Sequence, residues 1–277
     1  MGSINDDRTQ RKSLSTRESR ALSRLASEDR QIITISDIEA VLDIPRTAAK
    51  DMAFALAEKG WLERLIQGTY LIVPLAAGEN AVYTTHEFVI ASALVEPAYI
   101  GYWSAMNHHG LTEQLSQTVY IVTTERARKR EIHGVTYRPV SVTERKFFGY
   151  QPTAVGSTRV NVASIEKTLV DCADHPEFCG GISELATAMQ SAVDTRCSWD
   201  RVVDYLRRLG NGAATKRIVY LADQLDIALP EYHDLVESFT TGYPLLDPTR
   251  EATGTRDSKY QLRLNVNRES IEPSEFS

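Results

Sequence analysis

The sequence has few cysteines and no long hydrophobic run. Three cysteines occur in 277 residues, at Cys172, Cys179 and Cys197, which is too few for a disulfide framework and typical of a reducing compartment. No stretch approaches the ~18 consecutive apolar residues of a membrane-spanning helix. The polar N-terminus also lacks the apolar segment of a signal peptide. We therefore expect a cytoplasmic protein without a membrane segment.

An excess of basic charge is also missing. The net charge is −6, with 42% hydrophobic and 25% charged residues, as in an ordinary globular protein. Residues 1–74 contain 11 basic and 11 acidic residues, so the rest of the chain carries the whole negative charge. A nucleic-acid-binding segment within residues 1–74 must therefore separate its charges onto different faces.

The motifs of common catalytic and metal sites are absent. The chain has no glycine-rich phosphate loop, no GxSxG and no HExxH. His108 and His109 are adjacent, and on a helix they would point about 100° apart, which is unsuitable for chelating one metal ion. Cys172, His175 and Cys179 lack the paired short spacing of a zinc site. We predict no metal, no cofactor and no enzymatic activity.

Three carboxylates lie on or near one predicted helix. They are Glu166, Asp171 and Asp174, and no partner base or nucleophile accompanies them in the sequence. Acidic residues on a helix are usually solvated, so we expect these three on its exposed side.

The most informative stretch runs from Ile35 to Val73. It predicts two helices joined by a tight turn, followed by a β-hairpin, in the order of a winged helix-turn-helix. The first helix is expected to be capped by Ser36, and the second to open at Pro45 and end at Gly60. The expected segments are Ser36–Leu42, Pro45–Lys59, the hairpin strands Trp61–Leu65 and Thr69–Val73, and a preceding strand Arg30–Thr34.

The second of these helices has two different sides. Small apolar residues such as Ala49 and Ala53 share one side, whereas Arg46, Thr47 and Lys50 share the other near the N-terminal end. The first turns of a recognition helix enter the major groove, where Arg and Lys bind guanine edges or phosphates. We therefore predict DNA contacts by these three residues, although any amphipathic surface helix has two such faces.

Two neighbouring segments offer further contacts. In the hairpin tip, Arg64, Gln67 and Thr69 could contact phosphate or the minor groove, while Tyr70 is expected to be a core aromatic. A helix predicted over Thr16–Ser27 carries a basic stripe that could contact phosphates or could be a solvated face. The stripe consists of Arg17, Arg20 and Arg24.

The sequence pattern predicts two domains after a disordered N-terminus over residues 1–13. A winged helix-turn-helix domain over 14–74 ends at a breaker segment, and a larger mixed α/β domain spans 81–277. The fold class is α+β. In the second domain we expect helices at 85–94 (capped by Thr85), 103–109, 163–173, 182–193, 199–209, 212–225 and 230–237, and strands at 118–123, 134–139, 159–162 and 260–266, the last returning to the sheet.

A basic tract lies between two of these strands. It contains Arg126, Arg128, Lys129 and Arg130. A basic tract on an acidic domain is unusual and could contact phosphate. The alternative is a solvated loop between strands.

The chain resembles the AbiEi-type antitoxins of bacterial abortive-infection systems, which are type IV toxin–antitoxin regulators linked to phage defence. The resemblance covers most of the chain, and its two middle segments are the most specific. The segments that carry it are EKGWLERLIQGTYLIVP, YIGYWSAMNHHGLTEQLSQTVYIVT, RVNVASIEKTLVDCADHPEFCGGISEL and LRLNV.

The resemblance implies an autorepressor whose winged helix binds inverted repeats in its own promoter. It also implies a C-terminal antitoxin domain, acting on a nucleotidyltransferase-like toxin without a stable complex. By position, DNA contact would involve Arg46, Thr47, Lys50 and the hairpin tip. The tip departs from the family, because Ile66 and Gln67 stand where basic residues are expected.

Two other functions remain open. The winged helix could bind another protein rather than DNA, in which case binding would not show the steep salt dependence of a DNA complex. The C-terminal domain could instead be a nucleotide-modifying enzyme, which nucleotide or metal binding by that domain would indicate.

Overall fold

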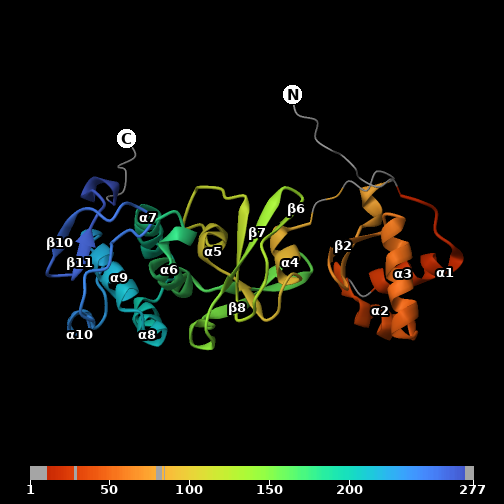
Figure 1. Cartoon of the computed structure of the whole chain (residues 1–277), viewed down its shortest axis with the longest axis horizontal. Helices are drawn as coiled ribbons and strands as arrows, with labels where there is room; N and C mark the ends of the chain where they lie inside the picture. The colour runs from red at the N-terminus through yellow and green to blue at the C-terminus, as the bar shows by residue number, and fades with distance from the viewer. Residues whose placement is uncertain (1–10, 28–29, 79–82, 84, 272–277) are drawn as a thin grey trace, which may run out of the picture. The chain divides into compact units, whose positions relative to one another are not determined.

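The computed structural model describes residues 11–27, 30–78, 83 and 85–271, and the protein is of the mixed α+β class (Figure 1). The chain forms two compact units. The N-terminal unit comprises residues 1–96 with 153–160, and the larger C-terminal unit comprises residues 97–152 with 161–277. Among the described residues, no helix is both long and apolar enough to cross a membrane.

The N-terminal unit begins with three helices and three strands. The predicted order of helix, strand, helix, turn, helix and hairpin is present, and the three strands form an antiparallel sheet in the order β1-β3-β2. Thr34 on β1 faces Thr69 on β3, so β1 lies beside the hairpin. The elements are α1 (Thr16–Ala26), β1 (Ile32–Thr34), α2 (Ile35–Leu42), α3 (Arg46–Glu58), β2 (Leu62–Ile66) and β3 (Thr69–Ile72).

The ends of α2 and α3 depend on local capping. The prediction of Ser36 as the cap of α2 is wrong, because Thr34 caps this helix. The Thr34 hydroxyl accepts a hydrogen bond from the Asp37 amide, and the Asp37 carboxylate accepts one from the Thr34 amide. Asp43 ends α2 in the left-handed conformation, with φ 53°. Pro45 caps α3 without joining it, and Gly60 follows the helix at φ 72°.

The core of this unit lies between the helices and the sheet. Small residues allow α3 to approach its neighbours closely, as Ala49 and Ala53 are fully buried. The hairpin contributes Tyr70, which is 8% exposed and confirms the prediction of a core aromatic. Further members of this core are Ala21, Leu25, Ile33, Ile35, Ile38, Met52, Leu56 and Leu62.

Polar contacts connect the start of the chain to α3 and β3. Lys59, just after α3, donates to both carboxylate oxygens of Glu18 on α1 at 2.7 and 2.8 Å. Arg11 lies over the ring of Trp61 and donates to the carbonyl of Val73 at 2.9 Å. Residues 1–10 of the stretch expected to be disordered lie outside the described residues.

The C-terminal unit contains most of the remaining elements. The helices expected at 182–193 and 199–209 match α7 and α8, and the strand at 118–123 matches β5. The helix expected at 85–94, which belongs to the N-terminal unit, is shorter, and His86 caps it where Thr85 was expected. The elements are α4 (Glu87–Ser92), β4 (Ala98–Ile100), α5 (Tyr102–His108), β5 (Thr118–Thr123), β6 (Arg130–Ile132), β7 (Val135–Ser141), β8 (Tyr150–Val155), β9 (Thr158–Ala163), α6 (Ile165–Asp174), α7 (Ile182–Val193), α8 (Trp199–Leu209), α9 (Gly212–Gln224), α10 (Tyr232–Glu237), β10 (Thr255–Asp257) and β11 (Leu262–Leu264).

A six-stranded mixed sheet has the order β6-β7-β5-β4-β9-β8. Strand β5 pairs with β7 in parallel and with β4 antiparallel. Strands β4, β6 and β8 were not predicted from the sequence. The strand expected to return to this sheet at 260–266 is a wrong prediction, because β11 pairs with β10 in a separate two-stranded sheet.

Helix α6 is the centre of the helical part of this unit. It contacts α5, α7, α8 and α9, which surround it in Figure 1. Nine of its ten residues are buried, including Glu166, Asp171 and Asp174. The expectation that these three carboxylates are solvated is therefore wrong, because four helices and residues of β4 and the loop before β8 pack around α6.

Candidate nucleic-acid interface

The turn between α2 and α3 determines how α3 is presented. The left-handed conformation of Asp43 turns the chain sharply, and its amide donates to the carbonyl of Glu39. Pro45 then starts α3 with φ −61° and ψ 152°. The apolar side of α3 faces the core through Ala49 and Met52, so the opposite side faces solvent.

This outer face of α3 carries the residues that the sequence predicted. Arg46, Thr47 and Lys50 are all exposed and lie within the first two turns. No side-chain partner of Lys50 occurs among the described residues, so its ammonium group is available. Phe54 extends the same face and is 65% exposed, which is unusual for a large aromatic side chain.

Arg46 is not free on this face. Its guanidinium donates to the Glu39 carboxylate at 2.8 Å and to the Ser36 hydroxyl at 3.3 Å, both on α2. The Arg46 side chain is still 59% exposed. This ion pair was not predicted from the sequence, although Glu39 precedes Arg46 by only seven residues. The pair orients the guanidinium, but it also places a negative charge beside it.

The hairpin tip presents the second predicted group. Gly68 turns the chain at φ 79°, and its carbonyl accepts the amide of Ile35 at 3.0 Å, which attaches the tip to the start of α2. A register shift between Arg64 and Ile66 interrupts the pairing with β3. Arg64 and Gln67 are exposed, and Thr69 is half-buried.

The third predicted group lies on α1 and borders a hollow of about 360 Å³. Arg17, Arg20 and Arg24 are exposed and make no side-chain hydrogen bond or ion pair with the described residues. The hollow also reaches the α2–α3 turn and the inner side of α3. Its lining consists of Thr16, Arg17, Arg20, Ala21, Arg24, Leu42, Ile44 and Met52.

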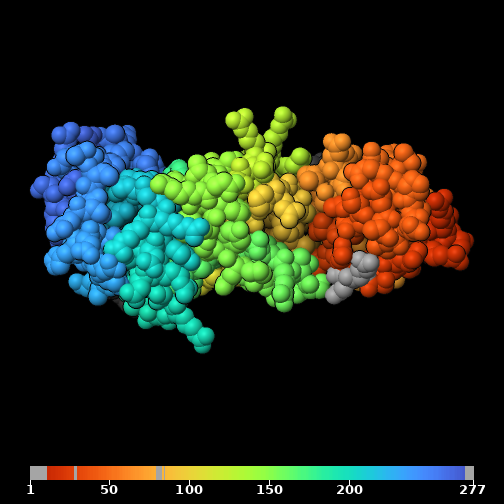
Figure 2. All heavy atoms as spheres, turned by 90° about the horizontal axis from the view of Figure 1, so that it is seen from below, coloured from red at the N-terminus to blue at the C-terminus, as the bar shows by residue number. Residues whose placement is uncertain are grey.

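The basic tract belongs to the C-terminal unit. Arg126, Arg128 and Lys129 precede β6, and Arg130 is the first residue of that strand, so the tract is only partly the loop that was expected. All four side chains are exposed and unpaired within the described residues. Figure 2 shows side chains of the yellow-green segment that contains the tract projecting from the surface.

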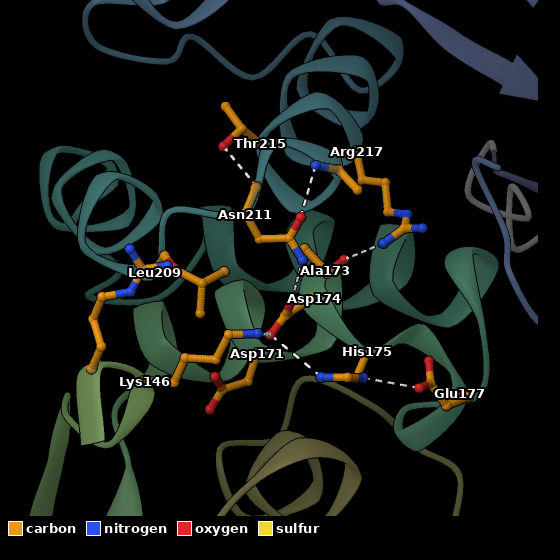
Figure 3. A network of polar contacts seen from close by, with 12 residues as sticks. Lys146, Asp171, Ala173, Asp174, His175, Glu177, Leu209, Asn211, Thr215 and Arg217 are labelled. Carbon is orange, nitrogen blue, oxygen red and sulfur yellow. Dashed lines mark hydrogen bonds and ion pairs between the residues drawn. The ribbon is translucent and has the colours of Figure 1, made fainter. Parts of the chain in front are cut away.

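A polar network in the C-terminal unit surrounds the end of α6 (Figure 3). The Asp174 carboxylate accepts from Lys146 at 2.5 Å and from Asn211, and the His175 ring lies 3.5 Å away. Arg217 donates to the carbonyl of Ala173 at 2.9 Å. The network therefore joins α6 to the start of α9 and to the segment before β8.

A second buried pair lies one turn earlier on α6. Lys167 is fully buried, contacts the Asp171 carboxylate and lies 4.5 Å from the centre of the Phe148 ring. Tyr99 donates to the same carboxylate at 3.0 Å. Burial raises the pKa of Asp171 even though Lys167 opposes this shift. These groups satisfy one another in the core, as structural ion pairs do.

The residues considered for metal binding are not arranged for it. Cys172 and Cys179 are buried, whereas His175 contacts Glu177 at 2.9 Å. His109 contacts the carbonyl of Ala163 at 2.7 Å. In the described part of the chain, no group of three or more His, Cys, Asp or Glu residues could hold a metal ion.

Comparison with known proteins points to a regulator family for part of the chain. Residues 20–73 match the family model described as "Transcriptional regulator, AbiEi antitoxin". This match confirms the resemblance to AbiEi-type antitoxins over α2, α3, the three strands and most of α1. A search of curated proteins found no match.

The fold also occurs in a solved structure. The crystal structure of the RV2827C protein from Mycobacterium tuberculosis is similar, with a TM-score of 0.65 and 18% identity over 96% of each chain. At this identity the similarity establishes a common fold for the chain.

Proposed function

We propose that this chain is a DNA-binding transcriptional autorepressor and the antitoxin of a type IV toxin–antitoxin operon. Its N-terminal unit would act in the cytoplasm as a winged helix that recognises inverted repeats in the operon's own promoter. Binding there represses transcription by occluding the promoter. The family match over residues 20–73 supports this proposal, since that family consists of transcriptional regulators.

The observation that carries the proposal is the outer face of α3. Arg46, Thr47 and Lys50 are exposed near its N-terminal end, while small buried residues hold its other side to the core. A helix presented in this way can enter the major groove, where Arg bonds a guanine edge twice and Lys binds a base or a phosphate.

Contacts to the DNA backbone would determine the register. We assign these contacts to the hairpin tip through Arg64, Gln67 and Thr69, and to the stripe on α1. Phosphate contacts position a protein on the duplex without reading its sequence. The stripe comprises Arg17, Arg20 and Arg24, and the basic tract from Arg126 to Arg130 is a candidate for secondary phosphate contacts.

The antitoxin part of the proposal rests on the family resemblance. The C-terminal unit would counter a nucleotidyltransferase-like toxin without forming a stable complex with it. Its buried ion pairs, such as Lys167 with Asp171, would serve the stability of that unit.

A second candidate function is a protein-interaction module. Phe54 favours it, because an aromatic side chain that is 65% exposed on the outer face of α3 is typical of a protein interface. The module would bind a partner through the same face, and its affinity would depend weakly on salt.

The test is fluorescence anisotropy with DNA from just upstream of the start codon, beside scrambled DNA of the same length, at two salt concentrations. An autorepressor binds the promoter DNA more tightly and loses affinity steeply as salt rises, because bound phosphates release counterions. Weak and equal binding to both DNAs would reject the proposal and favour the interaction module.

A further inference from the structure

The hollow beside α1 combines two features that differ from a simple DNA-backbone contact. One wall is basic and consists of Arg17, Arg20 and Arg24. A second wall is apolar and is formed by Leu42 and Ile44 at the α2–α3 turn. Phosphates of a DNA backbone would need only the basic wall, so the apolar wall suits a ligand with an apolar body.

The three guanidinium groups are arranged along one side of α1. They are separated by three and four residues, so neighbouring groups lie side by side, and the whole row rises by roughly 10 Å along the helix. None makes a side-chain hydrogen bond or ion pair with the described residues. Like charges at this spacing repel one another, and a group with two negative charges relieves that repulsion.

The apolar wall is part of the packed core. Met52 of α3, beside this wall, is 8% exposed, and Leu42 and Ile44 are half-buried. The hollow has a volume of about 360 Å³, within the ~300–1,000 Å³ of small-molecule sites. Such sites are mostly apolar, with a few polar groups that fix the ligand's orientation.

We propose that this hollow binds an organic phosphate ester with an aromatic or aliphatic body. Arg17, Arg20 and Arg24 hold the phosphate, because guanidinium groups bond phosphate oxygens in pairs. The apolar body packs against Leu42, Ile44 and Met52.

Ligand binding would have a consequence for DNA binding, and this step rests on the proposed function. The guanidinium groups that hold the ligand are the ones assigned to the DNA backbone. An organic phosphate in the hollow would therefore compete with DNA for the stripe on α1, which would make the site regulatory.

The test is isothermal titration of the full chain with 1-naphthyl phosphate, and separately with inorganic phosphate and with 1-naphthol. We expect 1-naphthyl phosphate to bind with a Kd of about 1 mM or tighter. Inorganic phosphate and 1-naphthol should each bind at least about tenfold more weakly, because each provides only half of the contacts. No DNA is present, so the result is independent of promoter binding.

Two variants locate the site, and a third variant serves as a control. Arg20→Gln removes the central charge and Ile44→Gln makes the apolar wall polar, and each should weaken 1-naphthyl phosphate binding by at least about tenfold. Arg196→Gln removes an exposed arginine of the C-terminal unit and should leave binding unchanged. Arg20 is exposed, and its side chain makes no hydrogen bond or ion pair with the described residues, so its replacement should preserve the fold.

Four results would overturn the proposal. The first is no binding of 1-naphthyl phosphate. The second is inorganic phosphate binding as tightly as 1-naphthyl phosphate, which indicates a plain phosphate contact. The third is 1-naphthol binding as tightly as 1-naphthyl phosphate, which indicates a purely apolar site. The fourth is unchanged binding by Arg20→Gln, which places the ligand elsewhere.

Discussion

Arg46 is held in place by its own domain before any DNA is present. Its guanidinium donates to Glu39 and Ser36 on the preceding helix. This arrangement limits the rotamers of the arginine, which favours binding. The Glu39 carboxylate and the Ser36 hydroxyl both accept from Nη1, however, so a guanine that uses this nitrogen must displace them. The affinity of α3 for DNA is therefore a balance between these two effects.

We expect Arg46→Ala to weaken promoter binding by about 1–3 kcal/mol, the usual loss when an arginine reads a guanine. Glu39→Gln should strengthen binding to both promoter and scrambled DNA, because it removes a negative charge near the phosphates and releases the guanidinium. Anisotropy titrations at a fixed salt concentration measure both effects.

The matched control is Arg207→Ala. Arg207 is an exposed, ion-paired arginine on a helix of the C-terminal unit, bonded to Glu231, and its replacement should leave promoter binding unchanged. Wild-type affinity in Arg46→Ala would remove Arg46 from the recognition surface.

Glu18 links α1 to the end of α3 and has an altered pKa. Hydrogen bonds from Lys59 and then from the Ser15 amide and hydroxyl lower the pKa of Glu18 from 4.5 to about 2. Because the folded pKa is lowered, the interaction stabilises the fold above pH 4.5, and this stabilisation is lost as the pH falls toward about 2.

Carboxyl-carbon NMR should therefore show Glu18 titrating near pH 2 in the folded chain. In Lys59→Met the Glu18 pKa should move up toward its ordinary value of 4.5. An ordinary Glu18 pKa in the wild type would mean that the contact between Lys59 and Glu18 is not maintained in solution.

At the scale of elements, local sequence signals predicted most helices. Part of the sheet was predicted wrongly, because strand pairing depends on residues far apart in the sequence. The turn before Pro45 and the glycine after α3 were recognisable because capping depends on nearby residues. Strand β4 has only three residues and is defined by partners far along the chain, as when Ile100 pairs with Val162. Similarly, the sequence placed the strand at 260–266 in the main sheet, but β11 pairs with β10.

Helix α6 allows a stability prediction for the C-terminal unit. Lys167→Met leaves the buried Asp171 without its cation, which should lower the free energy of unfolding by about 3–5 kcal/mol. Chemical denaturation of the full chain can measure this loss through tryptophan fluorescence in a Trp61→Phe background. The remaining tryptophans, Trp103 and Trp199, both report on this unit.

The control is the double variant Lys167→Met with Asp171→Leu. It removes both charges, and it should recover most of the lost stability because no uncompensated charge stays buried. If the double variant were as unstable as the single one, the loss would come from packing around Phe148 rather than from the unpaired charge.

At the scale of the whole molecule, the sequence predicted the exposed face of α3 better than the contacts around that face. It placed Arg46, Thr47 and Lys50 on one exposed helix face, because helical periodicity is a local property. The partner of Arg46 and the hollow beside α1 were not predictable, since both depend on how α1, α2 and α3 pack together. The carboxylates of α6 were misjudged for the same reason, because burial is a property of the folded unit.

Substitutions in the basic tract would show whether the C-terminal unit takes part in DNA binding. Replacing Arg126, Arg128 and Lys129 together by Gln should make the logarithmic salt dependence shallower by about one for each phosphate that the variant no longer neutralises. The ratio of promoter to scrambled affinity should stay the same, because phosphate binding carries no sequence information. A triple variant with the same charge change elsewhere on this unit, at Arg196, Arg207 and Arg256, should retain the wild-type slope. If both triple variants had the same salt-dependence slope, all phosphate binding would be assigned to the N-terminal unit. If the tract variant instead changed the ratio of promoter to scrambled affinity, the tract would contact bases.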